Sequence, residues 1–442
     1  GTMLCSQHVD LMIEGCTIIQ VVPPEVIMNG AIAVKDTRIV FVGRRNQVAN
    51  FTAEKRINAN GKAALPGLIN CHTHVAMTLF RGLAEDKPLE KWLKEDIWPL
   101  EAKLKPDDIY AGALLGCVEM IKCGVTCFAD MYFHEEAVAK AVKESGLRAV
   151  LAEGIIEAGN IALGEKMLER SISFARKFRD YADGRVKTML GPHAAYSCSP
   201  ELLIKVKEAA NQFGLGIHIH LAEDKKISKQ LKTNYNQSET EFLNNLGIFN
   251  EQTLAAHCID LSLKDLRILA DKGVNVAYVP VSNMKLGLGV ARVKEMLDLK
   301  VNVALGTDGP ASNNTLDIFE TIKFGALLQK HAYRSPTVIR ANEVLRMATI
   351  NGAQALGLEK EIGSLEVGKK ADIILIDLSA AHIRPIHDIY AALVYSVRGS
   401  DVDTVIVDGK ILMENRQLKY LDEEKIIANA EKHAFRLISN NY

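Results

Sequence analysis

The stretch AALPGLINCHTH, residues 63–74, is an apolar run that ends in two histidines separated by one residue. Seven further apolar runs follow, at residues 125–132, 148–155, 186–194, 216–223, 253–259, 274–280 and 301–309. Between them lie segments whose apolar residues recur every three or four positions, which is typical of amphipathic helices. Strands that alternate with helices form a parallel sheet with crossover helices. Eight such units predict an α/β fold, a (β/α)8 TIM-type barrel.

The two ends of the chain have a different pattern. Short alternating strands joined by Gly, Asp and Asn turns are expected at residues 9–20, 30–43, 371–379 and 403–415. We expect them to pair into a small β-sandwich built from both chain ends. The predicted division is a sandwich part at 1–63, a metal-dependent barrel at 64–370, and a second sandwich part with a terminal helix at 371–442.

The composition is that of a globular enzyme. Of its 442 residues 48% are hydrophobic, and 53 basic side chains nearly balance 54 acidic ones. A balanced charge disfavours nucleic acid or an anionic membrane as a partner and suits a small-molecule substrate. No apolar run reaches the roughly 18 to 20 residues of a membrane span. The eight cysteines lack metal-binding spacing and the first residues lack a secretory pattern, so we expect buried thiols and a cytoplasmic location.

Polar side chains gather at the ends of the predicted strands, where barrel enzymes carry their catalytic groups. Because side chains alternate along a strand, His72 and His74 face the same side and can bind one cation together. A third imidazole from His220 and a carboxylate from Asp308 would complete a metal site open to water. His218 shares the face of His220 and is the rival third ligand, but His220 lies nearer the strand end.

Seven segments, in order along the chain, resemble the amidohydrolase superfamily, and within it the deaminases of 5′-methylthioadenosine and S-adenosylhomocysteine. They read LPGLINCHTHVAMTLFRG, PLEKWLKEDIWPLEAKL, GPHAAYSCSP, HIHLAE, LAAHC, PVSNMKLGLG and LGTDGPASNN. The pattern HxH alone is a weak signal, whereas HxH, HxxE, a strand-end histidine and TDG at successive strand ends are a specific combination. The resemblance implies hydrolytic deamination of 5′-methylthioadenosine, S-adenosylhomocysteine, 5′-deoxyadenosine or adenosine to the inosine analogue and ammonia.

The resemblance also implies one divalent metal ion per subunit, held by His72, His74, His220 and Asp308. Zinc is the first choice, and iron(II) is compatible with the same donors. Relatives with two metals bridge them through a modified lysine at the end of the fourth strand. This chain has His193 there, which resembles a substrate-binding residue of the one-metal deaminases.

Catalytic roles follow from the same likeness. Asp308 would accept a proton from the attacking water, Glu223 would protonate N1 of the adenine ring, and His257 would stabilise the addition at C6. Two structural alternatives stand beside these roles. Glu223 could instead fix the His220 ring, and His257 could serve only in packing.

Two residues of the long segment after the first barrel strand are expected to bind substrate. Glu101 resembles the residue that accepts hydrogen bonds from the two ribose hydroxyls, and Trp92 would line the site. As alternatives, Glu101 and Lys105 could form an ordinary helical ion pair at positions i and i+4, and Trp92 could anchor a helix.

One position departs from the relatives that accept the homocysteine carboxylate. They carry an arginine near the end of the third strand, where this chain has Glu153. A carboxylate there repels a carboxylate substrate unless Arg148, Lys166 or another cation compensates. We therefore expect a preference for uncharged 5′-substituents.

Two competing interpretations of the chain are open. Guanine and triazine aminohydrolases or chlorohydrolases of the same superfamily share the metal donors, and a non-catalytic scaffold relative would be expected to lose them. The resemblance further suggests a homo-oligomer.

Overall fold

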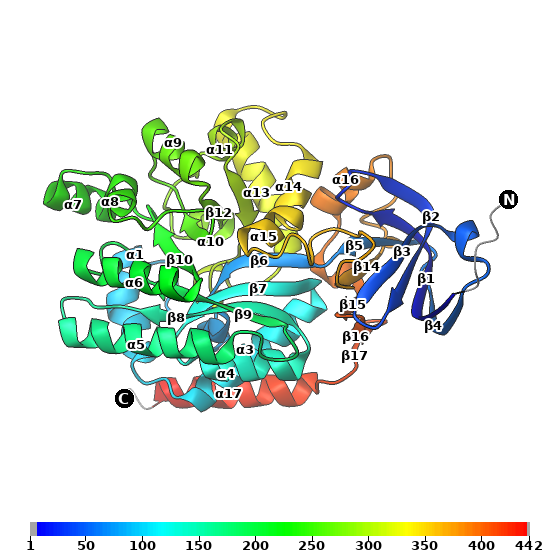
Figure 1. Cartoon of the computed structure of the whole chain (residues 1–442), viewed down its shortest axis with the longest axis horizontal. Coiled ribbons are helices and arrows are strands. Elements are labelled where there is room, and N and C mark those ends of the chain that lie inside the picture. The colour runs from blue at the N-terminus through cyan, green and yellow to red at the C-terminus, as the bar shows by residue number, and fades with distance from the viewer. Residues whose placement is uncertain (1–6, 440–442) are drawn as a thin grey trace.

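The computed structural model describes residues 7–439 of the chain. Its centre is an eight-stranded parallel sheet in the order β13-β12-β11-β10-β9-β8-β7-β6, which curls into the expected barrel (Figure 1). The strands are β6 (Leu68–Thr73), β7 (Val125–Tyr132), β8 (Arg148–Ile155), β9 (Val186–Pro192), β10 (Gly216–Leu221), β11 (Thr253–His257), β12 (Asn275–Tyr278) and β13 (Asn302–Leu305). The α/β barrel fold is thereby confirmed.

The barrel is nearly closed. Within residues 7–439 the first strand, β6, and the last, β13, share no strand pairing. Among these residues one backbone hydrogen bond crosses the gap: the N–H of Asp308, which follows β13, donates to the carbonyl of His72 near the end of β6 at 2.9 Å. Two candidate metal ligands thus lie on either side of the seam between the first and last strands.

Helices surround the strands, and several of them begin at a residue whose side chain caps the N-terminus. The helices are α3 (Pro106–Lys122), α4 (Glu135–Ser145), α5 (Ile161–Phe178), α6 (Pro200–Phe213), α7 (Lys225–Tyr235), α8 (Glu239–Asn245), α9 (Leu263–Lys272), α10 (Pro280–Lys285), α11 (Val293–Asp298), α12 (Pro310–Asn313), α13 (Ile318–Tyr333), α14 (Ala341–Met347) and α15 (Ile350–Ala355). In α6, for example, Ser199 caps the N-terminus through Leu202 N and Gly214 ends the helix in a left-handed conformation.

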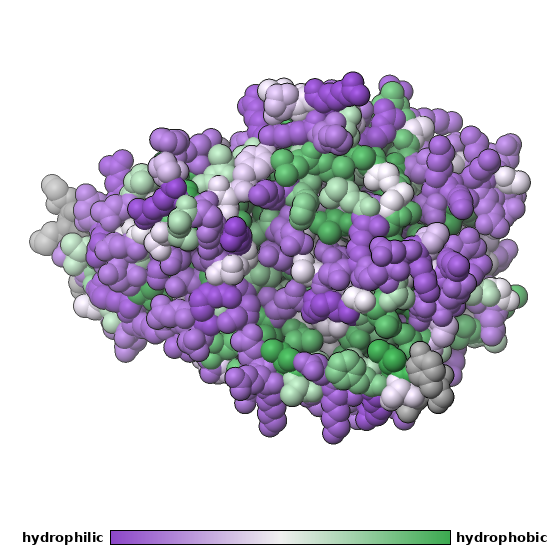
Figure 2. Space-filling view, turned by 180° about the vertical axis from the view of Figure 1, so that it is seen from behind, coloured by the Kyte–Doolittle hydropathy of each residue, from purple (hydrophilic) through white to green (hydrophobic). Residues whose placement is uncertain are grey.

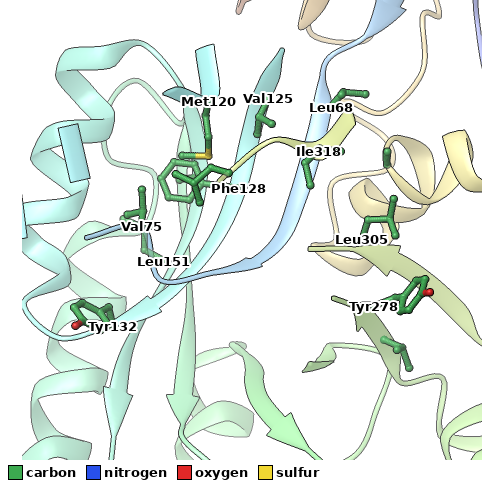
Figure 3. Close-up of a cluster of buried hydrophobic side chains, with 14 of the residues drawn as sticks. Leu68, Val75, Met120, Val125, Phe128, Tyr132, Leu151, Tyr278, Leu305 and Ile318 are labelled. Carbon is green, nitrogen blue, oxygen red and sulfur yellow. The ribbon is translucent and has the colours of Figure 1, made fainter. Parts of the chain in front are cut away.

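The main core lies between the barrel strands and the helices. Figure 3 shows part of it, where Met120 of α3 lies against Phe128 of β7. Both side chains are fully buried, as are Leu68 and Val125 at the start of β6 and β7. Burial of each such side chain stabilises the fold by about 1.5–3 kcal/mol. The apolar runs of the sequence therefore hold the strand ends, and the polar residues on them, in fixed positions.

Both chain ends contribute to a separate nine-stranded sheet, seen at the right of Figure 1. Its strands are β1 (His8–Ile19), β2 (Val26–Lys35), β3 (Arg38–Arg44), β4 (Thr52–Asn58), β5 (Lys62–Pro66), β14 (Ile373–Asp377), β15 (Val402–Val407), β16 (Lys410–Glu414) and β17 (Gln417–Leu418). The two ends join where β5 pairs with β14 in antiparallel register, with Ala64 opposite Leu375. The strands expected as a sandwich are thus hydrogen-bonded as one continuous sheet.

The predicted strand at residues 63–74 is in fact two strands that belong to different sheets. β5 pairs in the terminal sheet and β6 in the barrel, with Gly67 between them donating its N–H to the carbonyl of Asp372 at 3.1 Å. The apolar pattern gives no sign of this change of partner, since both strands are buried, and only the pair Pro66-Gly67 marks the junction in the sequence.

The last helix, α17 (Glu423–Ser439), packs along α3 of the barrel (Figure 1). His433 and Arg436 of α17 both contact the buried carboxylate of Asp108 at the start of α3. Within residues 7–439, no helix is both long enough and apolar enough to cross a membrane. The division into residue ranges 1–63, 64–370 and 371–442 stays a prediction.

Candidate active site

The carboxyl ends of the barrel strands bring five predicted residues together. His72 lies in β6, with His74 directly after it, and His220 and His257 lie in the neighbouring strands β10 and β11. Asp308 follows β13. Donor atoms of His72, His74 and His220 all lie within 4.8 Å of one another, as do those of His72, His257 and Asp308. Residues more than 230 positions apart in the chain therefore converge on one point.

The donor atoms suit a divalent cation. Asp308 Oδ1 lies 3.3 Å from His72 Nε2 and 3.2 Å from His74 Nε2. His72 Nε2 is buried and has no hydrogen-bond partner among the described residues. Imidazole nitrogens completed by one carboxylate oxygen are donors that zinc and iron(II) accept. An ion at their centre would satisfy the unpartnered nitrogen.

The opposite ring nitrogens are held by other groups. His74 Nδ1 lies 2.6 Å from the carbonyl of Met131, and His220 Nδ1 lies 2.8 Å from the carbonyl of His193. A carbonyl only accepts, so both Nδ1 atoms carry a proton, and in the neutral rings both Nε2 atoms keep a free lone pair. The backbone thus sets the ring form that a metal ligand needs.

His218, the rival ligand, has another role in the structure. It is fully buried, and its Nε2 lies 2.8 Å from His72 Nδ1. Because His218 Nε2 already contacts His72 Nδ1, His218 orients the ring of His72. Alternation along the strand placed His218 and His220 on one face but gave no sign of this contact.

Glu223 lies beside His257, with its Oε1 3.4 Å from His257 Nε2. Burial raises the pKa of the Glu223 carboxyl, which favours the protonated acid. The alternative in which Glu223 fixes the His220 ring finds no contact here, because the carbonyl of His193 takes that position.

The histidine that ends strand β11 and the aspartate that follows strand β13 have unusual backbones. His257 has φ 78° and Asp308 has φ 60°, both in the left-handed region. Such a conformation costs about 1–3 kcal/mol in a non-glycine residue and clusters at functional sites. Contacts in the surrounding structure therefore offset this conformational free energy and hold the two side chains in their orientation.

A cavity opens from the candidate ligands toward solvent. One wall is the segment of α1 (Leu89–Trp92), the π-helical turn η3 (Leu93–Ile97) and α2 (Trp98–Glu101). The lining includes Trp92, Trp98, Glu101, Tyr132, His193, His220, Glu223 and Asp308. All nine predicted site residues lie in or directly beside this cavity. Tyr132 was not predicted, and its buried hydroxyl has no hydrogen-bond partner among residues 7–439.

Glu101 is half-buried, and burial raises its pKa to about 7. It does not form the alternative helical ion pair with Lys105. Helix α2 ends at Glu101, while Lys105 precedes α3, and none of the ion pairs among residues 7–439 joins them. Burial also lowers the pKa of His193 to about 3, so this ring is neutral, with its Nδ1 2.8 Å from Ser197 Oγ.

Glu153 is held by the backbone. Its two carboxylate oxygens accept hydrogen bonds from the N–H groups of His134 (3.0 Å) and Glu135 (3.1 Å), at the N-terminus of α4. Arg148 cannot compensate the negative charge of Glu153 near a substrate. Arg148 lies at the opposite end of β8 and pairs with Asp372 and Asp408.

A second cavity, of about 590 Å³, continues from the first past Glu101 and His193. Glu153 and the cations Lys166 and Arg170 line it. Arg170 was not singled out from the sequence, since nothing but the position of α5 brings it here.

Comparison with known proteins identifies the family of the chain. The model of the amidohydrolase family matches residues 63–412. A 5-methylthioadenosine/S-adenosylhomocysteine deaminase of Moorella thermoacetica is 50% identical over 423 residues, covering 96% of this chain and 98% of that protein. A 5′-deoxyadenosine deaminase of Methanosarcina acetivorans is 49% identical over 411 residues, covering 93% of this chain and 94% of that protein.

The same architecture is found among solved structures. A zinc-bound adenosine deaminase from Xanthomonas campestris superimposes with a TM-score of 0.95 at 33% identity, covering 98% of this chain and 100% of that one. From the matched segment, these identities and the shared architecture, the chain belongs to the amidohydrolase family.

Proposed function

We propose that the protein hydrolyses the 6-amino group of 5′-modified adenosines, giving the inosine analogue and ammonia. The observation that carries the proposal is the convergence of His72, His74, His220 and Asp308, with Glu223 beside them, on one cavity. The similarity to a 5-methylthioadenosine/S-adenosylhomocysteine deaminase and to a 5′-deoxyadenosine deaminase supports it.

His72, His74, His220 and Asp308 would hold a single divalent cation, with zinc as the first choice. The donor set and the zinc-bound neighbour support this assignment. At the end of β9 the chain offers His193 and no lysine that could bridge a second ion. When bound, such a cation lowers the pKa of a coordinated water enough to supply hydroxide near pH 7.

The chain's own residues then move the protons. The oxygen of the attacking water bonds to C6 while Asp308 accepts a proton from that water. Glu223 gives its own proton to N1 of the ring. The raised pKa of Glu223 supports this assignment, since the acid must be protonated before the attack. The C6–N6 bond then breaks, ammonia leaves with the proton that Asp308 held, and the proton of the C6 hydroxyl passes to Glu223 as the 6-oxo group forms.

Glu101 and Trp92 would bind the nucleoside. A carboxylate accepts hydrogen bonds from both ribose hydroxyls, and Trp92, which is buried in the cavity wall, supplies apolar contact. His193, which is neutral, offers its Nε2 to the substrate because Ser197 already contacts Nδ1.

The second cavity would receive the 5′-substituent. Apolar side chains of Leu104, Leu163 and Met167 form much of its wall, and Glu153, Lys166 and Arg170 also line it. The carboxylate of Glu153 repels a negatively charged 5′-group, and the apolar wall suits an uncharged one. We therefore propose that uncharged 5′-groups, as in 5′-methylthioadenosine, 5′-deoxyadenosine and adenosine, are preferred to that of S-adenosylhomocysteine.

The test is an ammonia-release assay over these four nucleosides with guanine as a further substrate, on protein of known metal content. We expect the three uncharged nucleosides to have the higher kcat/KM. A clear advantage for S-adenosylhomocysteine would overturn the 5′-preference, and no release from any adenosine by zinc-loaded protein would overturn the function. Removal of the metal by a chelator should abolish activity, and added zinc should restore it.

A cytoplasmic location and a homo-oligomeric state are also part of the proposal. Apolar patches lie among hydrophilic residues on the face seen in Figure 2, and large apolar side chains such as Phe324 and Leu327 of α13 are exposed. Such patches are typical of subunit contacts.

A further inference from the structure

The short helix α10 carries two adjacent buried polar residues that no catalytic role has yet used. Helix α10 begins at Pro280, with one residue between it and the end of β12. Ser282 and Asn283 of this helix are fully buried. Each of the two contacts a different residue of the proposed machinery. Buried polar side chains cost free energy unless they are bonded, so their partners show what they are for.

Ser282 acts on Asp308. Its hydroxyl donates to Asp308 Oδ2 at 2.7 Å, and the hydroxyl of Ser312 in α12 lies 2.9 Å from the same oxygen. Two donors on Oδ2 fix the rotation of the carboxylate. The other oxygen, Oδ1, is thereby left facing His72 and His74.

Asn283 acts on His257. Its side-chain oxygen lies 2.9 Å from His257 Nδ1. This oxygen only accepts, so Nδ1 carries a proton, and in the neutral ring Nε2 is then the unprotonated nitrogen. His257 Nε2 has no hydrogen-bond partner among residues 7–439 and lies 3.4 Å from Glu223 Oε1 and 4.0 Å from Asp308 Oδ2.

We propose that Ser282 and Asn283, with Ser312, are positioning residues of the reaction, which act through Asp308 and His257 from one turn of helix. Ser282 and Ser312 select the carboxylate oxygen that faces the metal site. Asn283 selects the tautomer of His257, so that its Nε2 accepts a hydrogen from the attacking water and turns the water's lone pair toward C6. The inference rests on the proposed function.

For the serines, the test compares Ser282→Ala and Ser312→Ala with the control Ser145→Ala. Ser145 is equally buried, but its hydroxyl donates to the carbonyl of Val142, away from the cavity. Loss of a group that orients a metal ligand typically lowers metal affinity or activity about 10–100-fold. We expect each cavity variant to show such a loss in kcat or in zinc affinity, measured by competition with a chelating dye, with KM changed less than threefold. Wild-type kcat and zinc affinity in both variants would overturn this part.

For Asn283, the test compares two variants whose side chains branch at the same atom. Asn283→Asp keeps an acceptor for His257 Nδ1, whereas Asn283→Leu removes it. We expect kcat to fall about 10–100-fold in the leucine variant and far less in the aspartate variant, with a changed pH profile only in the leucine variant. Asn275→Ala is the control, because the buried Asn275 amide donates to carbonyls at the other end of β12.

A spectroscopic readout separates this inference from the function itself. Long-range ¹⁵N–¹H spectra of histidine-labelled, metal-free protein distinguish Nδ1–H from Nε2–H rings, and the signal of His257 is assigned with a His257→Gln sample. We expect His257 as Nδ1–H in the wild type and in Asn283→Asp, and a changed form in Asn283→Leu. An Nε2–H ring in the wild type would overturn the role of Asn283, whether or not the protein deaminates adenosines.

Discussion

Replacing Glu223 by glutamine tests the proposed proton donor directly. The amide has the same size and can still donate a hydrogen bond to N1, but it cannot transfer a proton. Burial already favours the neutral acid at this position, so a neutral amide should not disturb the fold. The side chain contacts His257 at 3.4 Å, and it belongs to neither group of donor atoms that could hold the metal.

The expected magnitude follows from its role. A positioned general acid contributes about 10²–10⁴-fold to a rate, which corresponds to roughly 2.7–5.4 kcal/mol of transition-state stabilisation. We expect kcat to fall by this amount, with KM changed less than about threefold because the hydrogen bond to N1 persists. The donor is active only while protonated. Wild-type kcat/KM should therefore fall as pH rises through the raised pKa of Glu223, and this alkaline limb should be absent from the variant.

The assay is steady-state ammonia release from 5′-methylthioadenosine between pH 5 and 10, with zinc content measured on the same samples. Glu239→Gln is the matched control, since Glu239 is also buried and its carboxylate accepts from the N–H of Ala222 outside the cavity. If Glu223→Gln keeps more than a tenth of wild-type kcat, Glu223 is not the proton donor. If it loses its zinc while the control does not, Glu223 is part of the metal site.

Three further predictions concern charges elsewhere in the fold. Arg148→Met should lower the free energy of unfolding by about 3–5 kcal/mol, measured in urea, because it leaves Asp372 and Asp408 unpaired, while kcat of the folded fraction stays unchanged. Glu101→Gln should raise KM for nucleosides about tenfold and should make the enzyme indifferent to loss of the ribose 2′-hydroxyl, as a comparison with 2′-deoxyadenosine would reveal. Burial raises the pKa of Glu239 to about 8, so its penalty on stability is absent near pH 4 and grows as pH rises to 8. Glu239→Gln should therefore raise Tm at pH 9 and leave it nearly unchanged at pH 5, and an equal shift at both values would contradict this reasoning.

Periodicity alone predicted much of the barrel. β7 and β8 begin and end at the predicted residues, and the other barrel strands begin within a residue of theirs except β6. Prediction failed at residues 63–74, because a buried strand of the terminal sheet runs into a buried strand of the barrel without a change in hydrophobicity. Hydrophobic pattern reports burial, and it does not report which strand is the neighbour.

The candidate ligands were accessible from the sequence because strand ends converge by topology. The residues that orient these ligands could not be identified from the sequence. His218, Ser282 and Asn283 act through contacts between elements distant in the chain, and no periodicity encodes the orientation of a loop or a short helix. Glu153 shows the same limit, since its partners are backbone N–H groups that any residues would supply.

The seam of the barrel has a consequence for biosynthesis. His72 lies on one side of the seam and Asp308 on the other, and the backbone hydrogen bond between these two residues spans it. A nascent chain therefore lacks the carboxylate donor until almost the entire barrel has left the ribosome. The complete donor set forms only when the first and last strands meet, so a truncated or half-folded chain cannot assemble a hydrolytic centre.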